Sequence, residues 1–328
     1  MSLFPGRCTL LAIALAALAP SPLCGQDYPS KTVTLVVPLA AGTGMDVIAR
    51  LYGEKLAGRL TRPVIVENRP GANFVPPTQS VIAAPADGHT LLVATPTQLC
   101  TNQVLYKQPP YDPEKDLVPI SHYLMSPFIF VVNPSLPVRS VAEFIKYARE
   151  QPTSLSYSSP AGGGGPHYAV ELIRQRFGLR LTHVPYRSSP QSIQDIAAGH
   201  VHFAFAEAGA SRALIQQGKL RPLAVSTKQR LPALPDTPPF AEASGMSDFD
   251  FVAWHILVAR AGTPQPIIAR LNAEMKQIMG APDMQRRIAD IGLLPLDPPP
   301  LAETERYLES ETAKWAAILR SIGLAGSL

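Results

Sequence analysis

Two glycine-bearing loops are the places in this 328-residue sequence where binding or chemistry is expected. The first is AAGTGMD, residues 40–46, which lies between the apolar run TVTLVVPLA and a segment with helical spacing of apolar residues. Free backbone N–H groups at a helix start favour an anion, and Gly42 and Gly44 would let a ligand approach the backbone. Asp46 would repel an anion, so we expect it to act as the N-cap of the helix instead.

The second loop is SSPAGGGGPH, residues 158–167, again between a strand-like run and a helical one. Four successive glycines cost chain entropy, which favours a close approach of the backbone to a bound group. A flexible hinge or an entropic loop is the alternative explanation of this glycine run. Together the two loops predict a small anionic ligand held by backbone groups.

Nucleotide binding fits the sequence less well. Gly42-Thr-Gly44 follows a strand-like run, and Glu67 ends the next one, as in a dinucleotide fingerprint. The third small residue of that fingerprint would fall on Val47, so the match is weak. The glycine run of the second loop lacks a following Lys-Ser/Thr, so it is no P-loop. No cofactor is therefore expected.

Catalysis and metal binding also find little support. There is no G-x-S-x-G elbow, so a hydrolase would need Ser158 or Ser159 with His167 and a distant acid. His200 and His202 are spaced to share one face of a strand and could bind a metal. No third ligand stands at a suitable spacing, so we expect two surface or edge histidines and no metal site.

The N-terminus predicts export. Arg7 precedes the apolar run CTLLAIALAALA, whose length is typical of a signal-peptide core and too short to span a membrane. We expect cleavage near Gly25, which makes residues 1–25 a signal peptide and places the mature protein in the periplasm. A lipoprotein acylated at Cys24 ranks second, because Leu23 before it is not small.

Composition narrows the class of partner. The chain has 29 Lys and Arg against 25 Asp and Glu, a net charge of +4, without a basic run or stripe. This balance does not indicate a nucleic-acid partner. Cys100 would be the one cysteine left after removal of the signal peptide, so no intrachain disulfide is expected.

Short β-rich runs alternate with amphipathic runs along the chain, which predicts an α/β fold. LVPISHYL and PFIFVVN are expected as two successive strands. Residues 126–244 read as one compact lobe, lobe 2, and the last third of the chain is expected to return to the first. Residues 26–125 and 245–328 would then form lobe 1, joined to lobe 2 by two crossings that act as a hinge beside a cleft.

Ordered motifs along the sequence carry a family resemblance. They include VPLAAGTGMDVIARL, VENRPGA, PADGHTLL, SPAGGGGPH, HVPYR, GKLRPLAVST and LPALPDTPPFAEA. From about Tyr28 to the end, the sequence resembles the Bug family, the periplasmic receptors of tripartite tricarboxylate transporters. The resemblance implies a two-lobed periplasmic binding protein of the Venus-flytrap type, without catalysis. It also implies a small carboxylated solute held by the two loops, and membrane subunits of the transporter as partners.

The two loops and the resemblance together predict which residues bind the ligand, and the family's pattern is matched at Pro38, Gly42, Gly44, Asp46, Ser159, Gly163 and His167. The candidates are Pro38, Ala40, Ala41, Gly42, Thr43, Gly44, Met45, Asp46, Ser159, Pro160, Gly163, Gly164, Gly165, His167, Ala206 and Glu207. Gly164 and Gly165 replace common Ser or Thr, and Ala206 stands where the family often has Asp. We expect Glu207 to face the other side of its strand. A simple or aromatic carboxylic acid is therefore predicted in preference to an amino acid.

Two other functions stay open at this point. A sensor that passes its closed state to a signalling partner would use the same cleft, and the sequence does not separate sensing from transport. An exported enzyme ranks lower. We expect a monomer that binds no nucleic acid.

Overall fold

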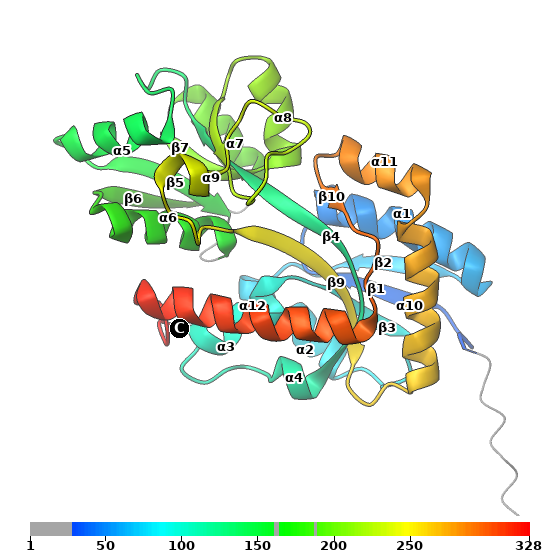
Figure 1. Ribbon diagram of the computed structural model, residues 1–328. Coiled ribbons are helices and arrows are strands. Elements are labelled where there is room, and N and C mark those ends of the chain that lie inside the picture. The colour runs from blue at the N-terminus through cyan, green and yellow to red at the C-terminus, as the bar shows by residue number, and fades with distance from the viewer. Residues whose placement is uncertain (1–27, 161–163, 187–188) are drawn as a thin grey trace, which may run out of the picture.

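Two lobes, each built on its own part of a continuous sheet, make up the protein (Figure 1). The computed structural model describes residues 28–160, 164–186 and 189–328. The strand order is β2-β1-β3-β9-β4-β7-β5-β6, and β8 and β10 pair with β4 outside this order. The mixed α/β class and the two lobes expected from the sequence are both confirmed.

The strands divide between the lobes through β4. Lobe 1 contains β1 (Val33–Val37), β2 (Val64–Asn68), β3 (Thr90–Ala94), β9 (Val252–Arg260), β10 (Leu294–Pro295) and the first part of β4 (Leu117–Val132). Lobe 2 contains the last part of β4 with β5 (Leu155–Pro160), β6 (Leu181–Tyr186), β7 (Phe203–Glu207) and β8 (Arg221–Val225).

The helices cover both lobes. Those before β4 are α1 (Gly44–Leu60), η1 (Ala72–Phe74), α2 (Val75–Ile82), η2 (Thr97–Thr101), α3 (Asn102–Leu105) and α4 (Pro113–Asp116). Those between β4 and β9 are α5 (Val141–Glu150), α6 (Gly165–Phe177), α7 (Ser189–Ala198), α8 (Ala208–Gln216) and α9 (Phe240–Ser244). The last are α10 (Gln265–Met279), α11 (Pro282–Asp290) and α12 (Leu301–Ser321). Among the described residues, no helix combines the length and apolar character needed to cross a membrane.

The first crossing between the lobes is β4, a single strand of 16 residues. The expectation of two strands here was wrong. A proline such as Pro127 lacks the N–H group that a ladder uses and could have broken the strand. Pro127 stays in the strand, opposite Val252 of β9. The pairing of β4 with β9 shifts register between Pro119 and Leu124.

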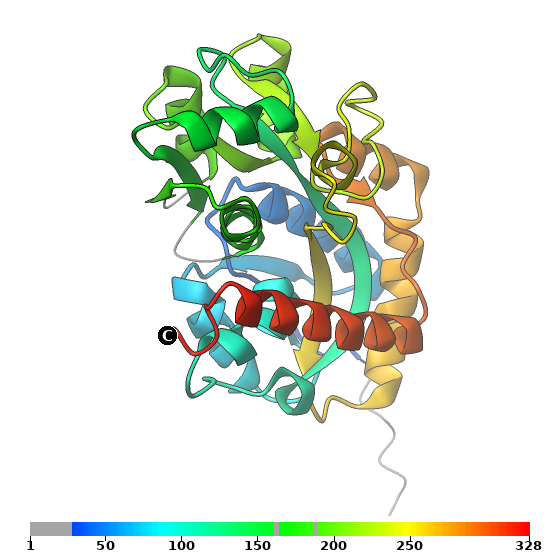
Figure 2. The ribbon, with the colours of Figure 1, turned by 60° about the vertical axis from the view of Figure 1, so that its left-hand side comes forward.

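The second crossing is β9, which returns the chain to lobe 1 antiparallel to β4. Figures 1 and 2 show α12 running across the molecule beside these two strands, and α12 contacts both β4 and α6. The two expected crossings are thus present. The lobe boundaries, at residues 125/126 and 244/245, stay a prediction.

Three hydrophobic clusters form the core. One belongs to lobe 1, where Ile48 of α1 and Met275 of α10 pack on the sheet. Another belongs to lobe 2 and contains Ile196 of α7. The third runs through both lobes and includes Phe130 and Trp315. The lobes are therefore joined by packed side chains along α12 as well as by the two strands.

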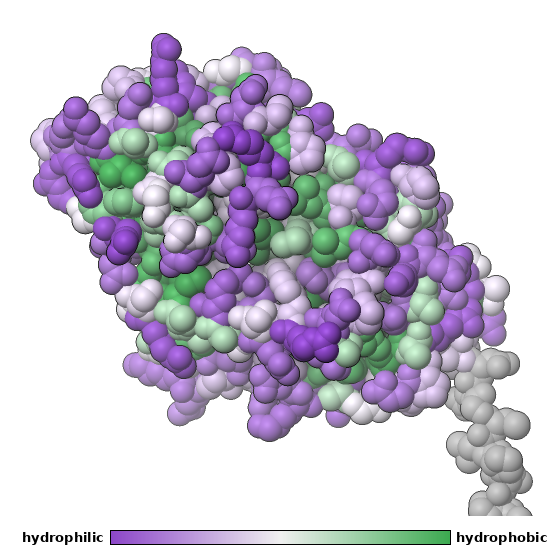
Figure 3. Space-filling model, in the orientation of Figure 1, coloured by the Kyte–Doolittle hydropathy of each residue, from purple (hydrophilic) through white to green (hydrophobic). Residues whose placement is uncertain are grey.

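Hydrophobic residues do not gather on one large surface in the view of Figure 1. Figure 3 shows that face as mostly hydrophilic, with hydrophobic residues in separate small areas. Large contiguous apolar patches mark stable interfaces, and this face displays none.

Candidate functional site

The candidate site lies where the carboxyl ends of parallel strands meet. β1 pairs in parallel with β2 and β3, and β5 pairs in parallel with β6 and β7. The segments that follow these strands therefore share one edge in each lobe. Figures 1 and 2 show the starts of α1 and α6 on the sides of the lobes that face each other. Ligands of open α/β sheets bind outside such carboxyl edges.

The first loop leaves the carboxyl end of β1. Pro38 is buried, whereas Ala40, Ala41 and Gly42 are exposed. Gly42 has a φ of 84°, which favours glycine. A Cβ atom built on Gly42 or Gly44 would meet nothing within 4 Å, so the space above this loop is open.

Asp46 lies at the third position of α1, so the expectation that it is the N-cap was wrong. Its carboxylate accepts a hydrogen bond from the Gly42 N–H at 2.8 Å and contacts Arg50 and Asn68 at 3.0 and 2.9 Å. Burial would raise the pKa of Asp46, but these hydrogen bonds outweigh it, and the pKa lies below its ordinary value. The charged carboxylate of Asp46 therefore holds the first loop against α1 and the end of β2.

Thr43 is the N-cap of α1. Its hydroxyl accepts from the Asp46 N–H at 3.4 Å and donates to the carbonyl of Ala40 at 3.0 Å. Because the Thr43 hydroxyl donates its proton to the Ala40 carbonyl, it cannot also donate a hydrogen bond to a ligand. The sequence predicted Thr43 as a ligand-binding residue, and the structure assigns its hydroxyl to capping.

The free donors of the first loop are backbone groups. Gly44 and Met45 occupy the first two helical positions, where N–H groups have no intrahelical acceptor. Neither N–H donates to any described residue. The side chain of Met45 is buried in the lobe 1 core, so Met45 can offer a ligand its backbone but not its thioether.

The segment after β2 reaches the same edge and carries backbone strain. Asn73 and Phe74 both have left-handed φ angles, 48° and 57°. Such a conformation is rare for a bulky residue and is found preferentially at functional sites. Phe74 is half-buried and is the N-cap residue of α2.

The second loop is described only in part. Pro160 ends β5 in register with Tyr186, and Gly163 lies outside the described residues. Gly164 has a φ of 118° and is the N-cap of α6. Gly165 and Pro166 follow as its first helical residues, and Pro166 has no N–H group to offer.

The serines before the second loop already have partners. The Ser159 hydroxyl lies 2.8 Å from Nε2 of His183, and the Ser158 hydroxyl lies 2.8 Å from that of Ser192. Both serines are buried. Ser159 thus pairs with His183, whereas a hydrolase would need a serine paired with His167.

His167 is half-buried against aromatic neighbours. Its Nδ1 lies 3.3 Å from the Tyr157 hydroxyl, which donates to Glu171, and its ring lies 4.3 Å from that of His183. Burial, together with His183, lowers the pKa of His167 to about 4. His167 is therefore neutral at pH 7 and acts as a hydrogen-bonding group.

The end of β7 differs from expectation. Ala206 is buried in the lobe 2 core, which argues against contact with a ligand. Glu207 ends the strand at the carboxyl edge as the N-cap of α8, half-buried, with the Ser189 hydroxyl 3.5 Å away. Burial raises the pKa of Glu207. Glu207 thus lies at the carboxyl edge, at the junction between β7 and α8, and the direction in which its side chain faces stays a prediction.

Other polar groups have structural partners. His202 precedes β7, and its Nδ1 lies 2.7 Å from the Ser156 hydroxyl, while Nδ1 of His200 lies 3.5 Å from Asp195. Within the described residues, no three His, Cys, Asp or Glu side chains are grouped to hold a metal ion. Cys100 is buried as a free thiol.

Sequence reasoning missed two side chains that hold the first loop. Arg50 follows Asp46 by one helical turn, a spacing that could have revealed the ion pair. Asn68 donates to both Asp46 and the carbonyl of Leu39. Its place at the carboxyl end of the neighbouring strand was the available signal.

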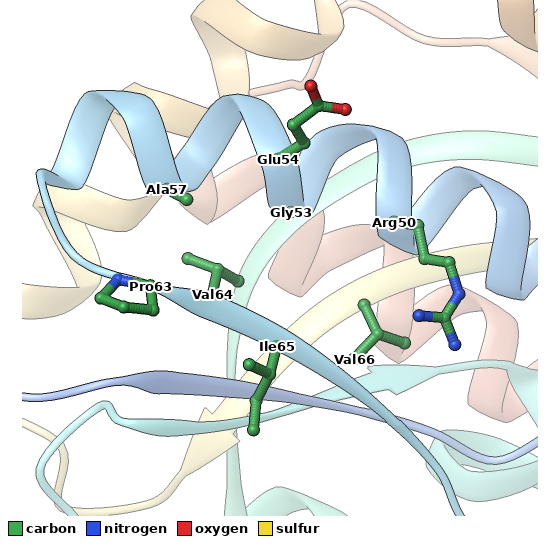
Figure 4. Close-up of a pocket in the computed structure, with 8 residues that line it drawn as sticks. All are labelled: Arg50, Gly53, Glu54, Ala57, Pro63, Val64, Ile65 and Val66. Carbon is green, nitrogen blue, oxygen red and sulfur yellow. The ribbon is translucent and has the colours of Figure 1, made fainter.

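A groove of about 550 Å³ lies elsewhere, between α1 and β2 (Figure 4). Gly53 and Ala57 of α1 face Val64 and Val66 of β2 across it, and Ile65 of this edge strand is 44% exposed. The groove follows the flank of α1 and offers no helix start, and the basic residue that lines it, Arg50, is already paired with Asp46. It therefore fits an anionic ligand less well than the carboxyl edges do.

Comparisons with known sequences give a consistent result. Residues 48–324 match the model of the family described as "Tripartite tricarboxylate transporter family receptor". The chain is 32% identical to a protein from the tcbD–tcbE intergenic region of Pseudomonas sp. (strain P51), covering 95% of this chain and 93% of the relative. It is 30% identical to BugT of Bordetella pertussis, covering 95% of each.

Solved structures agree with the fold. Rpa4515 of R. palustris with adipate superimposes with a TM-score of 0.84 at 34% identity, covering 91% of this chain and 99% of the other. MatC of Rhodopseudomonas palustris with bound malate gives a TM-score of 0.80 at 27% identity, covering 89% and 100%. The chain therefore belongs to the Bug-type receptors of tripartite tricarboxylate transporters and is a solute-binding protein.

Proposed function

We propose that this protein captures a small carboxylic acid between its lobes and delivers it to the membrane subunits of a tripartite transporter. The observation that carries the proposal is the pair of N–H groups of Gly44 and Met45, which point from the start of α1 without a described acceptor. A helix start carries partial positive charge and binds carboxylates. The open space above Gly42 and Gly44 leaves room for the ligand.

The start of α6 supports the same proposal from lobe 2. Gly165 and His167 lie in its first turn, and their N–H groups donate to no described residue. A carboxylate between the two helix starts would receive donors from both lobes, so binding would favour the closed arrangement. Solute and protein need no catalytic group for this task, and we propose no enzymatic activity.

The chemical class of the ligand follows from the acids at the site. Asp46 is bound by Gly42, Arg50 and Asn68, so it is not available to an amine. Glu207 is a candidate acid at the lobe 2 edge, and burial raises its pKa. The solved relatives named above hold adipate and malate, which are acids without an amine. We therefore propose a simple or aromatic carboxylic acid in preference to an amino acid.

Calorimetry with a panel of adipate, malate, benzoate and glutamate, with and without a chelator, tests the ligand class. We expect a simple acid to bind more tightly than glutamate, with no effect of the chelator. Tighter binding of glutamate would make Glu207 an amine-binding group and contradict the proposed class. Loss of binding in the chelator would reveal a metal requirement.

A matched pair of variants at Gly44 tests the helix start itself. Gly44→Ala keeps the N–H group, and its Cβ meets nothing within 4 Å. Gly44→Pro removes the N–H, and proline suits the first helical position after the extended Thr43. Both variants place a Cβ atom in the open space above the loop, so the comparison between them isolates the N–H group. A hydrogen bond to a charged group contributes about 1.5–3 kcal/mol, so the proline variant should bind the acid about tenfold to a hundredfold more weakly than the alanine variant. Equal affinities would remove this N–H from the site.

Location and assembly complete the proposal. Membership of the receptor family supports a periplasmic site of action after cleavage near Gly25. We propose a monomer, which size-exclusion chromatography with light scattering would check. Co-purification with the membrane subunits, in the presence of the acid, would test the transport partner.

A further inference from the structure

The carboxylate of Glu311 accepts hydrogen bonds from both tryptophans of the chain. Its Oε2 lies 3.0 Å from Nε1 of Trp254 and 3.0 Å from Nε1 of Trp315. Lys314 pairs with the other oxygen. All three bridged side chains are buried, and a buried carboxylate is costly unless it is paired and hydrogen-bonded in this way.

This bridge connects elements that are far apart in the sequence. Trp254 lies on β9, the strand that crosses between the lobes, and Trp315 lies on α12. Glu311 stands one turn before Trp315 on the same helix, so it fixes the indole of Trp315 relative to the crossing strand.

Trp315 in turn packs against the start of α6. Its ring lies 6.0 Å from that of Tyr168 and 5.5 Å from that of Phe251. A Cβ atom on Gly165, the first residue of α6, would lie 3.5 Å from Cη2 of Trp315. The indole therefore lies directly against the helix start that follows the glycine-rich loop.

We propose that Glu311 is a positioning residue for the start of α6. It acts through Trp315, which it orients, and so sets the place of the α6 start relative to the crossing strand β9. This inference rests on the proposed function for the claim that the α6 start receives the ligand. It goes beyond that function because Glu311 is a buried residue of α12 that would affect the site through Trp315.

Three variants separate a positioning role of Glu311 from a general contribution to the stability of the fold. Glu311→Gln keeps an amide oxygen that can accept both indole N–H groups, whereas Glu311→Leu removes the acceptor. Glu274→Leu is the matched control, because Glu274 is also a buried, ion-paired glutamate on a helix, α10, without a contact to α6. Native-state hydrogen exchange at the amides of residues 168–170, the first that donate hydrogen bonds within α6, reports the start of this helix directly.

Glu311→Leu should speed exchange at residues 168–170 by about tenfold, while Glu311→Gln and Glu274→Leu leave it within about threefold. A loss of thermal stability in Glu311→Leu without faster exchange at these amides would overturn the proposal. If Glu311→Leu does not fold, Trp315→Phe removes the same hydrogen bond and keeps an aromatic ring. Unchanged exchange in Trp315→Phe would equally overturn it.

Binding of the adipate and malate probes distinguishes this inference from the proposed function. Faster exchange in Glu311→Leu with weaker binding of a probe, and rescue of both by Glu311→Gln, supports both proposals. Faster exchange with unchanged probe binding supports positioning and contradicts the role of the α6 start in binding. Tryptophan fluorescence is a direct check on the bridge, since the two bridged indoles are the two tryptophans of the sequence.

Discussion

Two buried histidines make the free energy of unfolding depend on pH. His122 lies on β4 and His255 on β9, and each has one ring nitrogen without a hydrogen-bond partner among the described residues. Burial lowers the pKa of His122 to about 4. Burial, with His122 nearby, lowers the pKa of His255 to about 3. Both histidines are therefore neutral in the folded protein at pH 5. In the unfolded chain at the same pH, both are charged.

The sign and size of this pH dependence follow from the difference in bound protons between the folded and the unfolded state. Because the folded pKa is depressed, the unfolded state binds protons first, and stability is lost as the pH falls below about 6.5. At pH 5 each histidine costs about 2 kcal/mol, since pH 5 lies about 1.5 units below the unfolded-state pKa at about 1.4 kcal/mol per unit. The pair therefore costs about 4 kcal/mol, a large share of the 5–15 kcal/mol typical of a folded protein.

Urea denaturation at pH 7 and pH 5 measures this loss. The comparison is between the wild-type protein and His255→Phe, which keeps a ring but cannot bind a proton. Other titrating groups contribute equally to both proteins. The variant should therefore lose about 2 kcal/mol less than the wild type between the two pH values. An equal loss in the two proteins would refute the buried, neutral state of His255.

Three further predictions concern the loop, the lobes and export. Asp46→Asn should lower the free energy of unfolding by about 1–3 kcal/mol in urea at pH 7, because its charged hydrogen bonds to the loop are lost; an unchanged value would contradict the anchoring role. A Cβ on Gly209 of α8 would lie 1.9 Å from the carbonyl oxygen of Ile291 in lobe 1. Gly209→Ala should therefore hold the lobes apart, increase the radius of gyration in X-ray scattering and weaken acid binding, whereas Gly58→Ala, with nothing within 4 Å, should change neither. N-terminal sequencing of the native protein should begin near Gln26, and an uncleaved chain in the cytoplasm would contradict export.

The two loops could be predicted from the sequence because their signals are local. A strand, a glycine-bearing turn and a helix follow one another within about a dozen residues, and parallel pairing then places both loops at carboxyl edges. The role of Asp46 was harder to predict. Thr43 and Asp46 both favour helix starts, and the choice of cap depends on how Gly42 turns the chain.

Features that depend on distant contacts were not predictable. The bond between Glu311 and Trp254 joins residues 57 positions apart, and nothing in the local pattern of α12 indicates it. The direction of the Glu207 side chain is also hard to predict, because the alternation along β7 ends where α8 begins, one residue later. Pro127 lacks the N–H group of a ladder, yet pairing with β9 keeps β4 continuous through it.

A crystal structure with the tightest-binding acid of the panel tests the central claim most directly. We predict a carboxylate oxygen of the ligand within hydrogen-bond distance of the N–H groups of Gly44 or Met45, with the lobe 2 donors at the start of α6 on its other side. An acid bound elsewhere, such as in the groove between α1 and β2, would contradict the account.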